Sequence, residues 1–74
     1  MSDPWHDWCL HCVEEARGLA TQTSTSIEIA MLTILSVLIP ETLERFPDIE
    51  LSQALKELAL HACIAGQEAR QQSG

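Results

Sequence analysis

The sequence predicts an all-α domain of three helices, completed by a second copy of the chain. Apolar residues recur at helical spacing in three segments, which polar or proline-containing stretches separate. Ala, Leu and Glu are frequent, Tyr is absent, and Gly and Pro number three each, which disfavours a strand-rich fold. With 74 residues, of which 46% are apolar, the chain has room for one small domain. A core of this size often needs a partner chain.

The first helix is expected over Pro4–Leu19. Asp3 is a good N-cap, and Pro4 suits the first helical position because its missing N–H would have no helical partner there. Gly18 and the polar run 21–24 mark the end of the helix. A 4-3-4-3 spacing of apolar residues defines one face of this helix, formed by Trp5, Cys9, Cys12, Ala16 and Leu19.

The second helix is expected over Ser26–Ile39, as a central and buried element. Residues 27–39 are apolar around nearly the whole helix, so they need cover on most sides. Thr25 and Glu28 have the spacing of a capping box. Pro40 disfavours helical geometry before it, which predicts a stop there and a separate helical turn over 41–46. A membrane span needs about 20 apolar residues, so no membrane association is expected.

The third helix is expected over Ile49–Arg70, with Asp48 as its N-cap and a loose tail at 71–74. A 4-3-4-3-4 spacing predicts a core-facing seam along it, formed by Leu51, Leu55, Leu58, Ala62, Ala65 and Ala69. Two further apolar residues, Leu60 and Ile64, lie nearly opposite this seam and need a second cover.

The number of apolar residues predicts a homodimer. Three short helices cannot easily bury all of them in one chain, and a bare apolar face would favour aggregation. Closed two-fold dimers are the commonest oligomers. The interface is expected on the second helix and part of the third, at Ile27, Met31, Ile34, Leu35, Leu38, Leu60 and Ile64.

The charge is strongly acidic, with 11 acidic against 4 basic residues and a net charge of −7. This disfavours direct nucleic-acid binding, which needs a basic patch. Many of the acids lie near expected helix starts, where they favour the positive end of the helix dipole. One group is expected either to border an apolar partner surface or to mimic nucleic-acid phosphates for a basic partner: Glu41, Glu44, Asp48 and Glu50. Small acidic helical proteins such as anti-CRISPR proteins are similar in general style, but no motif links the chain to them.

Cysteine and histidine allow three interpretations. Cys9 and Cys12 form a C-x-x-C pair, which with His61 or Cys63 has the donor types of a zinc site. The string over 8–12, WCLHC, resembles the active-site string of thioredoxin-like proteins, without the strand and turn that precede it there. Buried cysteine otherwise behaves as a small hydrophobe. Because the pair falls inside an expected helix, we favour core residues with no cofactor and keep a zinc- or redox-responsive module as the alternative.

Trp5 and Trp8 lie within one turn of helix, where they either cap the core or anchor a partner. No Ser–His–Asp relay or Gly-rich phosphate loop is evident, so an enzyme is not expected. The first residues lack a basic region followed by an apolar core, which predicts a cytoplasmic protein. By elimination, the expected function is that of a regulator, adaptor or inhibitor. It would bind another protein through an apolar helical surface with an acidic rim.

Overall fold

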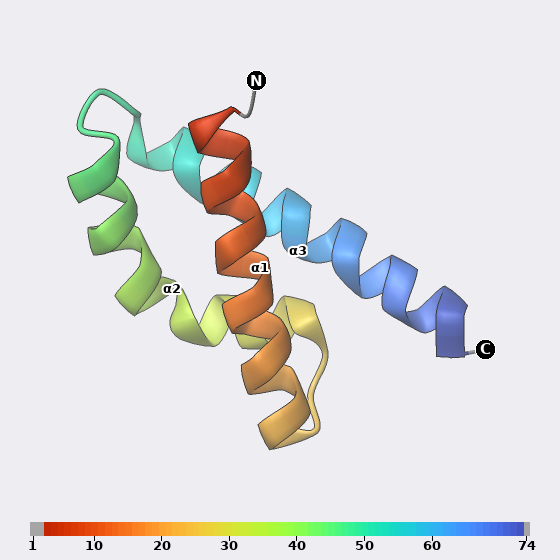
Figure 1. Cartoon of the computed structure of the whole chain (residues 1–74). Helices are drawn as coiled ribbons and strands as arrows, with labels where there is room; N and C mark the ends of the chain where they lie inside the picture. Colours follow the sequence, from red (N-terminus) through yellow and green to blue (C-terminus); the bar gives the residue numbers. More distant parts are fainter. Residues whose placement is uncertain (1–2, 74) are drawn as a thin grey trace.

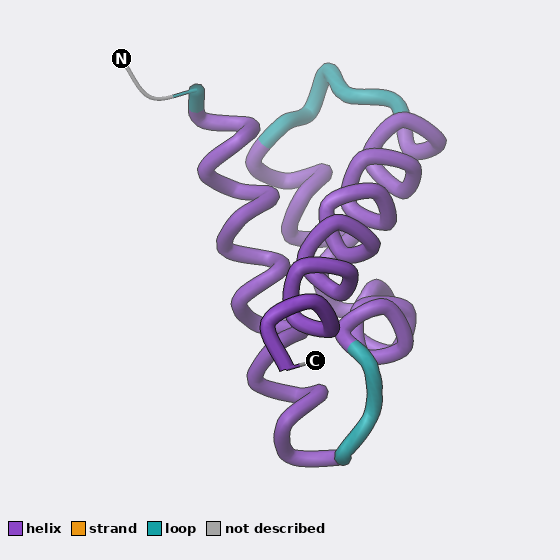
Figure 2. Tube along the Cα trace, turned by 90° about the vertical axis from the view of Figure 1, so that its right-hand side faces the viewer, coloured by secondary structure: helices purple, strands orange, loops and turns teal. Residues whose placement is uncertain are grey.

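The computed structural model describes residues 3–73 and contains three helices, α1 (Pro4–Thr23), α2 (Ile27–Arg45) and α3 (Leu51–Ser73) (Figure 1). No strand occurs in this part of the chain, so the prediction of a three-helix all-α domain is confirmed. Each helix contacts the other two, and short loops connect them (Figure 2). The trace is flat, with principal extents of 40, 28 and 17 Å. The predicted loose tail is wrong for 71–73, which belong to α3, and position 74 lies outside the described residues.

The start of α1 follows the prediction. The Asp3 carboxylate accepts a hydrogen bond from the Trp5 backbone N–H at 3.0 Å, and a proline occupies the first turn. The helix continues four residues beyond the predicted range Pro4–Leu19. It ends at Ser24, whose φ of 57° places it in the left-handed region while its N–H donates to the Ala20 carbonyl. The polar residues before Ser24 therefore extend the helix instead of ending it.

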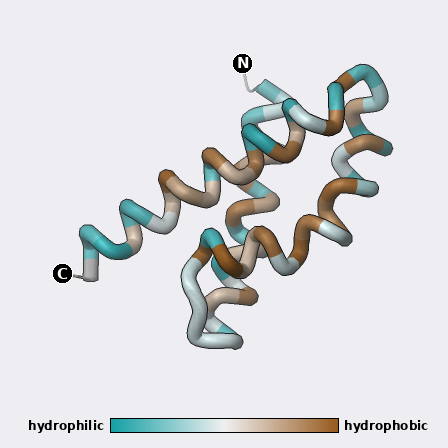
Figure 3. Tube along the Cα trace, turned by 180° about the vertical axis from the view of Figure 1, so that it is seen from behind, coloured by the Kyte–Doolittle hydropathy of each residue, from teal (hydrophilic) through white to brown (hydrophobic). Residues whose placement is uncertain are grey.

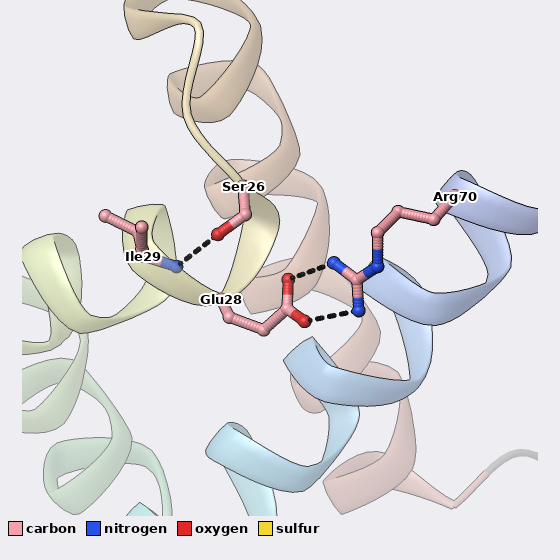
Figure 4. Close-up of polar contacts among 4 residues, drawn as sticks. All are labelled: Ser26, Glu28, Ile29 and Arg70. Carbon is pink, nitrogen blue, oxygen red and sulfur yellow. Dashed lines mark hydrogen bonds and ion pairs between the residues drawn. The ribbon is translucent and has the colours of Figure 1, made fainter. Parts of the chain in front are cut away.

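The start of α2 lies one residue later than predicted. The Ser26 hydroxyl accepts a hydrogen bond from the Ile29 backbone N–H at 3.2 Å and is the N-cap (Figure 4). The predicted capping box of Thr25 and Glu28 is therefore wrong. The Thr25 hydroxyl bonds to the Thr23 hydroxyl at 2.8 Å, and Glu28 points toward α3. Thr25 and Ser26 both carry hydroxyl groups that can cap a helix, and the structure uses the second of them.

Pro40 lies inside α2 instead of ending it. The prediction of a stop at this proline and a separate turn over 41–46 is wrong, because one helix includes Pro40 and runs on to Arg45. Pro40 has no N–H for the Ser36 carbonyl, and its ring crowds that carbonyl, which bends a helix. Figure 1 shows α2 curving along its length. Beyond the proline, the Thr42 hydroxyl donates to the carbonyl oxygen one turn earlier at 2.7 Å.

The start of α3 lies two residues later than predicted. Asp48 is not its N-cap, because it lies in a turn where the Ile49 N–H donates to the Phe46 carbonyl at 3.1 Å. The Ala54 N–H donates to the Glu50 carbonyl at 3.0 Å at the entry to the helix. The connection between α2 and α3 therefore includes Ile49 and Glu50, which the sequence pattern assigned to the first turn of the third helix.

The core-facing seam of α3 differs from the prediction in its first half. Leu51 and Leu55 are exposed, and Ala54 is fully buried in their place. The two leucines are one turn apart on the side of the helix next to Ala54. The small Ala54 side chain is therefore the buried position in the first turn of α3. The second half of the seam is buried as predicted, at Leu58, Ala62 and Ala65, with Ala69 packed against it.

A single core lies among the three helices and is rich in small side chains. Thr42 is the buried polar side chain of the described residues. Its hydroxyl is satisfied, because it accepts from the Trp8 indole and donates to the Leu38 carbonyl. The buried apolar cluster consists of Trp8, Cys9, Cys12, Val13, Ala16, Ala20, Ile27, Ala30, Met31, Leu38, Leu58, Ala62 and Ala65.

An ion pair joins the start of α2 to the last turn of α3. The Arg70 guanidinium donates to both oxygens of the Glu28 carboxylate, at 2.9 and 3.2 Å (Figure 4). The hydrogen bond from Arg70 is the main cause that lowers the pKa of Glu28. Gly66 lies beneath the pair, and a Cβ at this position would collide with the Glu28 carboxylate. The missing side chain of Gly66 therefore gives the carboxylate its place against α3.

Within residues 3–73, no single helix is long and apolar enough to cross a membrane. Helices α1 and α2 meet the length and composition criteria only as a pair, and this pair is bent by 116° at its connection.

Candidate functional site

The two cysteines of the C-x-x-C pair lie in the core. Cys9 and Cys12 are 0% exposed, because a three-residue spacing turns both toward the same side of α1. Burial is the main cause that raises the pKa of Cys9 to about 11 and that of Cys12 to about 12. Both thiols are therefore protonated at neutral pH, whereas the thiolate is the form that reacts or binds zinc. Their predicted place in the core is confirmed.

The four residues of the alternative zinc set do not come together. The His61 ring packs against His6 of α1, with ring centres 5.8 Å apart, and its Nδ1 lies 2.8 Å from the Glu57 carbonyl oxygen. Cys63 is exposed, whereas the C-x-x-C pair is buried. No three His, Cys, Asp or Glu side chains within 3–73 are grouped to hold a metal ion. On one helix, a spacing of two residues directs His61 and Cys63 to different sides.

The two tryptophans attach α1 to both other helices. The buried Trp8 indole donates to the Thr42 hydroxyl of α2 at 2.8 Å. The half-buried Trp5 indole donates to the Glu57 carboxylate of α3 at 3.0 Å and meets the Phe46 ring edge-on, with ring centres 5.1 Å apart. Both indoles thus make contacts within the chain, which is the arrangement of core caps. A partner anchor would have to give up these contacts.

Three of the seven predicted interface residues belong to the core of the single chain. Ile27, Met31 and Leu38 are buried, so the prediction that they contact a second chain is wrong. The apolar stripe that they form on α2 faces the other two helices of the same chain. The remaining predicted interface residues keep accessible surface: Ile34, Leu35, Leu60 and Ile64.

The chain nevertheless leaves a large apolar surface uncovered. Eight large apolar side chains of the described residues are 37–66% exposed. The accessible surface is 5011 Å², against roughly 4,500 Å² for a typical monomer of this mass. The flat shape of the chain contributes to this larger surface. The exposed set consists of Leu10, Ile29, Leu32, Val37, Leu51, Leu55, Leu60 and Ile64.

One uncovered surface lies where α2 and α3 separate. Leu32 is one turn beyond Glu28 on α2, and Leu55 is three turns before Gly66 on α3. Because Glu28 and Gly66 touch, these sides of the two helices face each other. Figure 3 shows the helices parting beyond that contact, with apolar positions along both. We name this surface the α2–α3 face, and its members are Leu32, Leu35, Ile39 and Leu55.

Leu60 and Ile64 lie on a different side of α3. Ile64 follows His61 by one turn, and the His61 ring contacts His6 of α1. Leu10 follows His6 by one turn, so it flanks the same contact from α1. The predicted interface that combined helix 2 with Leu60 and Ile64 is therefore split between two surfaces.

The acidic residues gather along two edges instead of one. Glu41, Glu44, Asp48 and Glu50 are exposed at the end of α2 and in the loop after it, as predicted for a rim. Glu14 and Glu15 are adjacent exposed residues of α1. An acidic edge on α1 was not part of the prediction.

A groove with a volume of about 430 Å³ runs between α1 and α2. Its apolar part is formed by Leu19 of α1 with Ile34, Val37 and Leu38 of α2. The α1 edge consists of Glu14, Glu15, Gly18 and Gln22. Two adjacent acids one turn before a helical glycine were the sequence signal for this edge. That signal has meaning only once α2 is placed beside α1.

Comparisons with protein-family models, curated proteins and solved structures found no match to this chain. The function is therefore argued from the geometry and chemistry of the chain itself.

Proposed function

We propose that the protein is a small acidic regulator, adaptor or inhibitor that acts by binding protein chains, without catalysing a reaction. The observation that carries the proposal is the set of eight exposed large apolar side chains on a domain of 8.2 kDa. Apolar patches of this kind mark interaction surfaces. The three free cysteines support a reducing, cytoplasmic location.

A homodimer through the α2–α3 face is part of this proposal. A two-fold interface uses the same patch on both subunits, so the patch must tolerate its own copy. The α2–α3 face contains four aliphatic residues and no charged one. Two copies of a chain with a net charge of −7 repel each other least where such a face forms the contact.

Native mass spectrometry of protein purified without chelator tests the proposal. We expect a metal-free species at twice the chain mass of 8.2 kDa. The double variant Leu32→Glu and Leu55→Glu should run as a monomer, because it places four carboxylates in the dimer contact. The matched control Leu60→Glu changes an exposed leucine outside the α2–α3 face and should stay dimeric.

A wild-type monomer at 100 μM would contradict the homodimer. A zinc ion per subunit that is lost in Cys9→Ser would instead favour the alternative of a metal-responsive module. Since the two thiols lie in the core, that variant is compared with Cys9→Ala by circular dichroism to separate metal loss from unfolding.

A further inference from the structure

We propose that the α1–α2 groove docks a basic amphipathic helix of another protein. This inference rests on the proposed interaction function and names the chemistry of its partner. The groove is separate from the α2–α3 face, because Val37 and Leu32 point to widely different sides of α2. The chain can therefore bind a partner in the groove and a second copy on the α2–α3 face at the same time.

The shape of the groove fits a helix. Its walls are two helices, and its α1 edge from Glu15 to Gln22 covers two turns, or about 10 Å. Val37 is exposed by 61%, and Leu19 and Ile34 are half-buried, so the floor offers apolar surface without being closed. An amphipathic helix fills such a groove with residues at i, i+3 or i+4, and i+7.

Gly18 supplies an independent observation. It lies inside α1, where glycine costs about 1 kcal/mol of helix stability relative to alanine. The fold does not require it, because its φ is not positive and nothing lies within 4 Å of the position of a Cβ. Glycine at this edge allows another backbone to approach closely. The only evident use of its missing side chain is therefore outside the chain.

The charge of the groove selects a basic partner. Glu14 and Glu15 are its only charged lining residues. Arg17 lies 3.4 Å from Glu14 and partly compensates that carboxylate, and the His11 ring lies 3.8 Å from Glu15. A second copy, with its charge of −7, would meet repulsion here. Lysine or arginine beside the apolar stripe of a partner helix would instead be attracted.

The probe for this proposal is a fluorescein-labelled 18-residue amphipathic helix of leucine and lysine, measured by fluorescence anisotropy. Two peptides serve as references, one with the same composition in scrambled order and one with glutamate in place of lysine. We expect the leucine–lysine helix to bind and both references to bind at least 10-fold more weakly. Binding should weaken further as NaCl rises from 50 to 300 mM, because salt screens the carboxylates.

Gly18→Trp tests the location, because Gly18 lines the groove and a Cβ there meets no atom within 4 Å, so the substitution places an indole at the groove edge. It should weaken binding of the leucine–lysine helix at least 10-fold, and Glu14→Gln with Glu15→Gln about 3-fold or more. Gln67→Trp is the matched control on an exposed position of α3 and should bind like the wild type. Circular dichroism of each variant verifies that the helices are intact.

Three results would overturn the proposal: no binding at 100 μM, equal binding of the glutamate peptide, or undiminished binding by Gly18→Trp. The monomeric variant Leu32→Glu with Leu55→Glu separates the two proposals. Retained peptide binding in that variant supports the groove. Peptide binding that disappears there, while Gly18→Trp still binds, places the peptide on the α2–α3 face and refutes the groove.

Discussion

At the scale of single residues, the environment decides the chemistry of cysteine. Cys9 and Cys12 have raised pKa values because the core excludes water from them, whereas Cys63 lies on the surface. The C-x-x-C spacing was recognisable in the sequence, and so was its helical context. The inference that the pair faces the core needed only helical geometry, which is why it could be made without the structure.

The thiols should differ in reactivity. With Ellman's reagent at pH 8, we expect one thiol per chain to react quickly and the other two only on unfolding in urea, because the two buried thiols are protonated. Cys63→Ser should abolish the fast phase and leave the slow one. Three fast thiols would show that Cys9 and Cys12 are accessible.

At the scale of the helices, the contact between α2 and α3 depends on one glycine. Gly66 leaves room for the Glu28 carboxylate, whereas Gly18 on α1 has no such neighbour. Both glycines lie inside α-helices. A neighbouring side chain occupies the space where a Cβ of Gly66 would lie, whereas the corresponding space at Gly18 is open. They therefore form a matched pair for measuring what the contact contributes.

Gly18→Ala should raise the free energy of unfolding by about 1 kcal/mol, the gain in helix propensity. Gly66→Ala should gain less, because its Cβ displaces the carboxylate and weakens the ion pair between Glu28 and Arg70. Urea denaturation measures both effects. In a Glu28→Ala background the gain from Gly66→Ala should increase, and an equal gain in both backgrounds would contradict the proposed contact.

The helix boundaries show where local sequence rules end. Asp3 caps α1 by accepting a hydrogen bond from a residue two positions later in the chain. The local sequence was therefore sufficient to predict this helix start. At α2, Thr25 and Ser26 are both good caps, and Glu28, the expected capping-box partner, binds distant Arg70 instead of the helix start. Pro40 is disfavoured inside a helix, but the packing of the residues around it outweighs that local cost.

At the scale of the whole molecule, the number of apolar residues was readable from the sequence and their distribution was not. Three short helices were expected to bury few apolar side chains. A second chain was therefore predicted to cover Ile27, Met31 and Leu38. In the structure these three residues pack into the single core that all three helices form. The uncovered residues are instead those on the outer sides, such as Leu32 and Val37.

The stability of the whole chain should depend on pH in a predictable way. The pKa of Glu28 is lowered in the folded chain. The ionised carboxylate therefore stabilises the folded chain above its ordinary pKa of 4.5, and this stabilisation is lost as the pH falls through the lowered value. The pKa values of Cys9 and Cys12 are raised to about 11 and 12. The neutral buried thiols therefore contribute fully to the stability of the folded chain below the ordinary thiol pKa of 9.0. This stability is lost as the pH rises toward 11 and 12.

Urea midpoints measured from pH 3 to pH 11 should therefore be nearly constant between about pH 5 and 9 and fall on both sides. Glu28→Gln should flatten the acid limb, and Cys12→Ala should flatten part of the alkaline limb. An alkaline limb unchanged in Cys12→Ala would contradict the buried state of that thiol.

The hydrogen bonds of the two tryptophans also fix an order of events during synthesis of the chain. The Trp8 indole cannot form its hydrogen bond until Thr42 has been added, 34 residues later. The Trp5 indole cannot form its own until Glu57 has been added, 52 residues later. At about 5 to 20 residues per second, the ribosome adds these partners about 2 to 10 s after the indoles. Until these partners are added, the first helix carries indoles without their hydrogen-bond acceptors, and the last helix to be made completes the core.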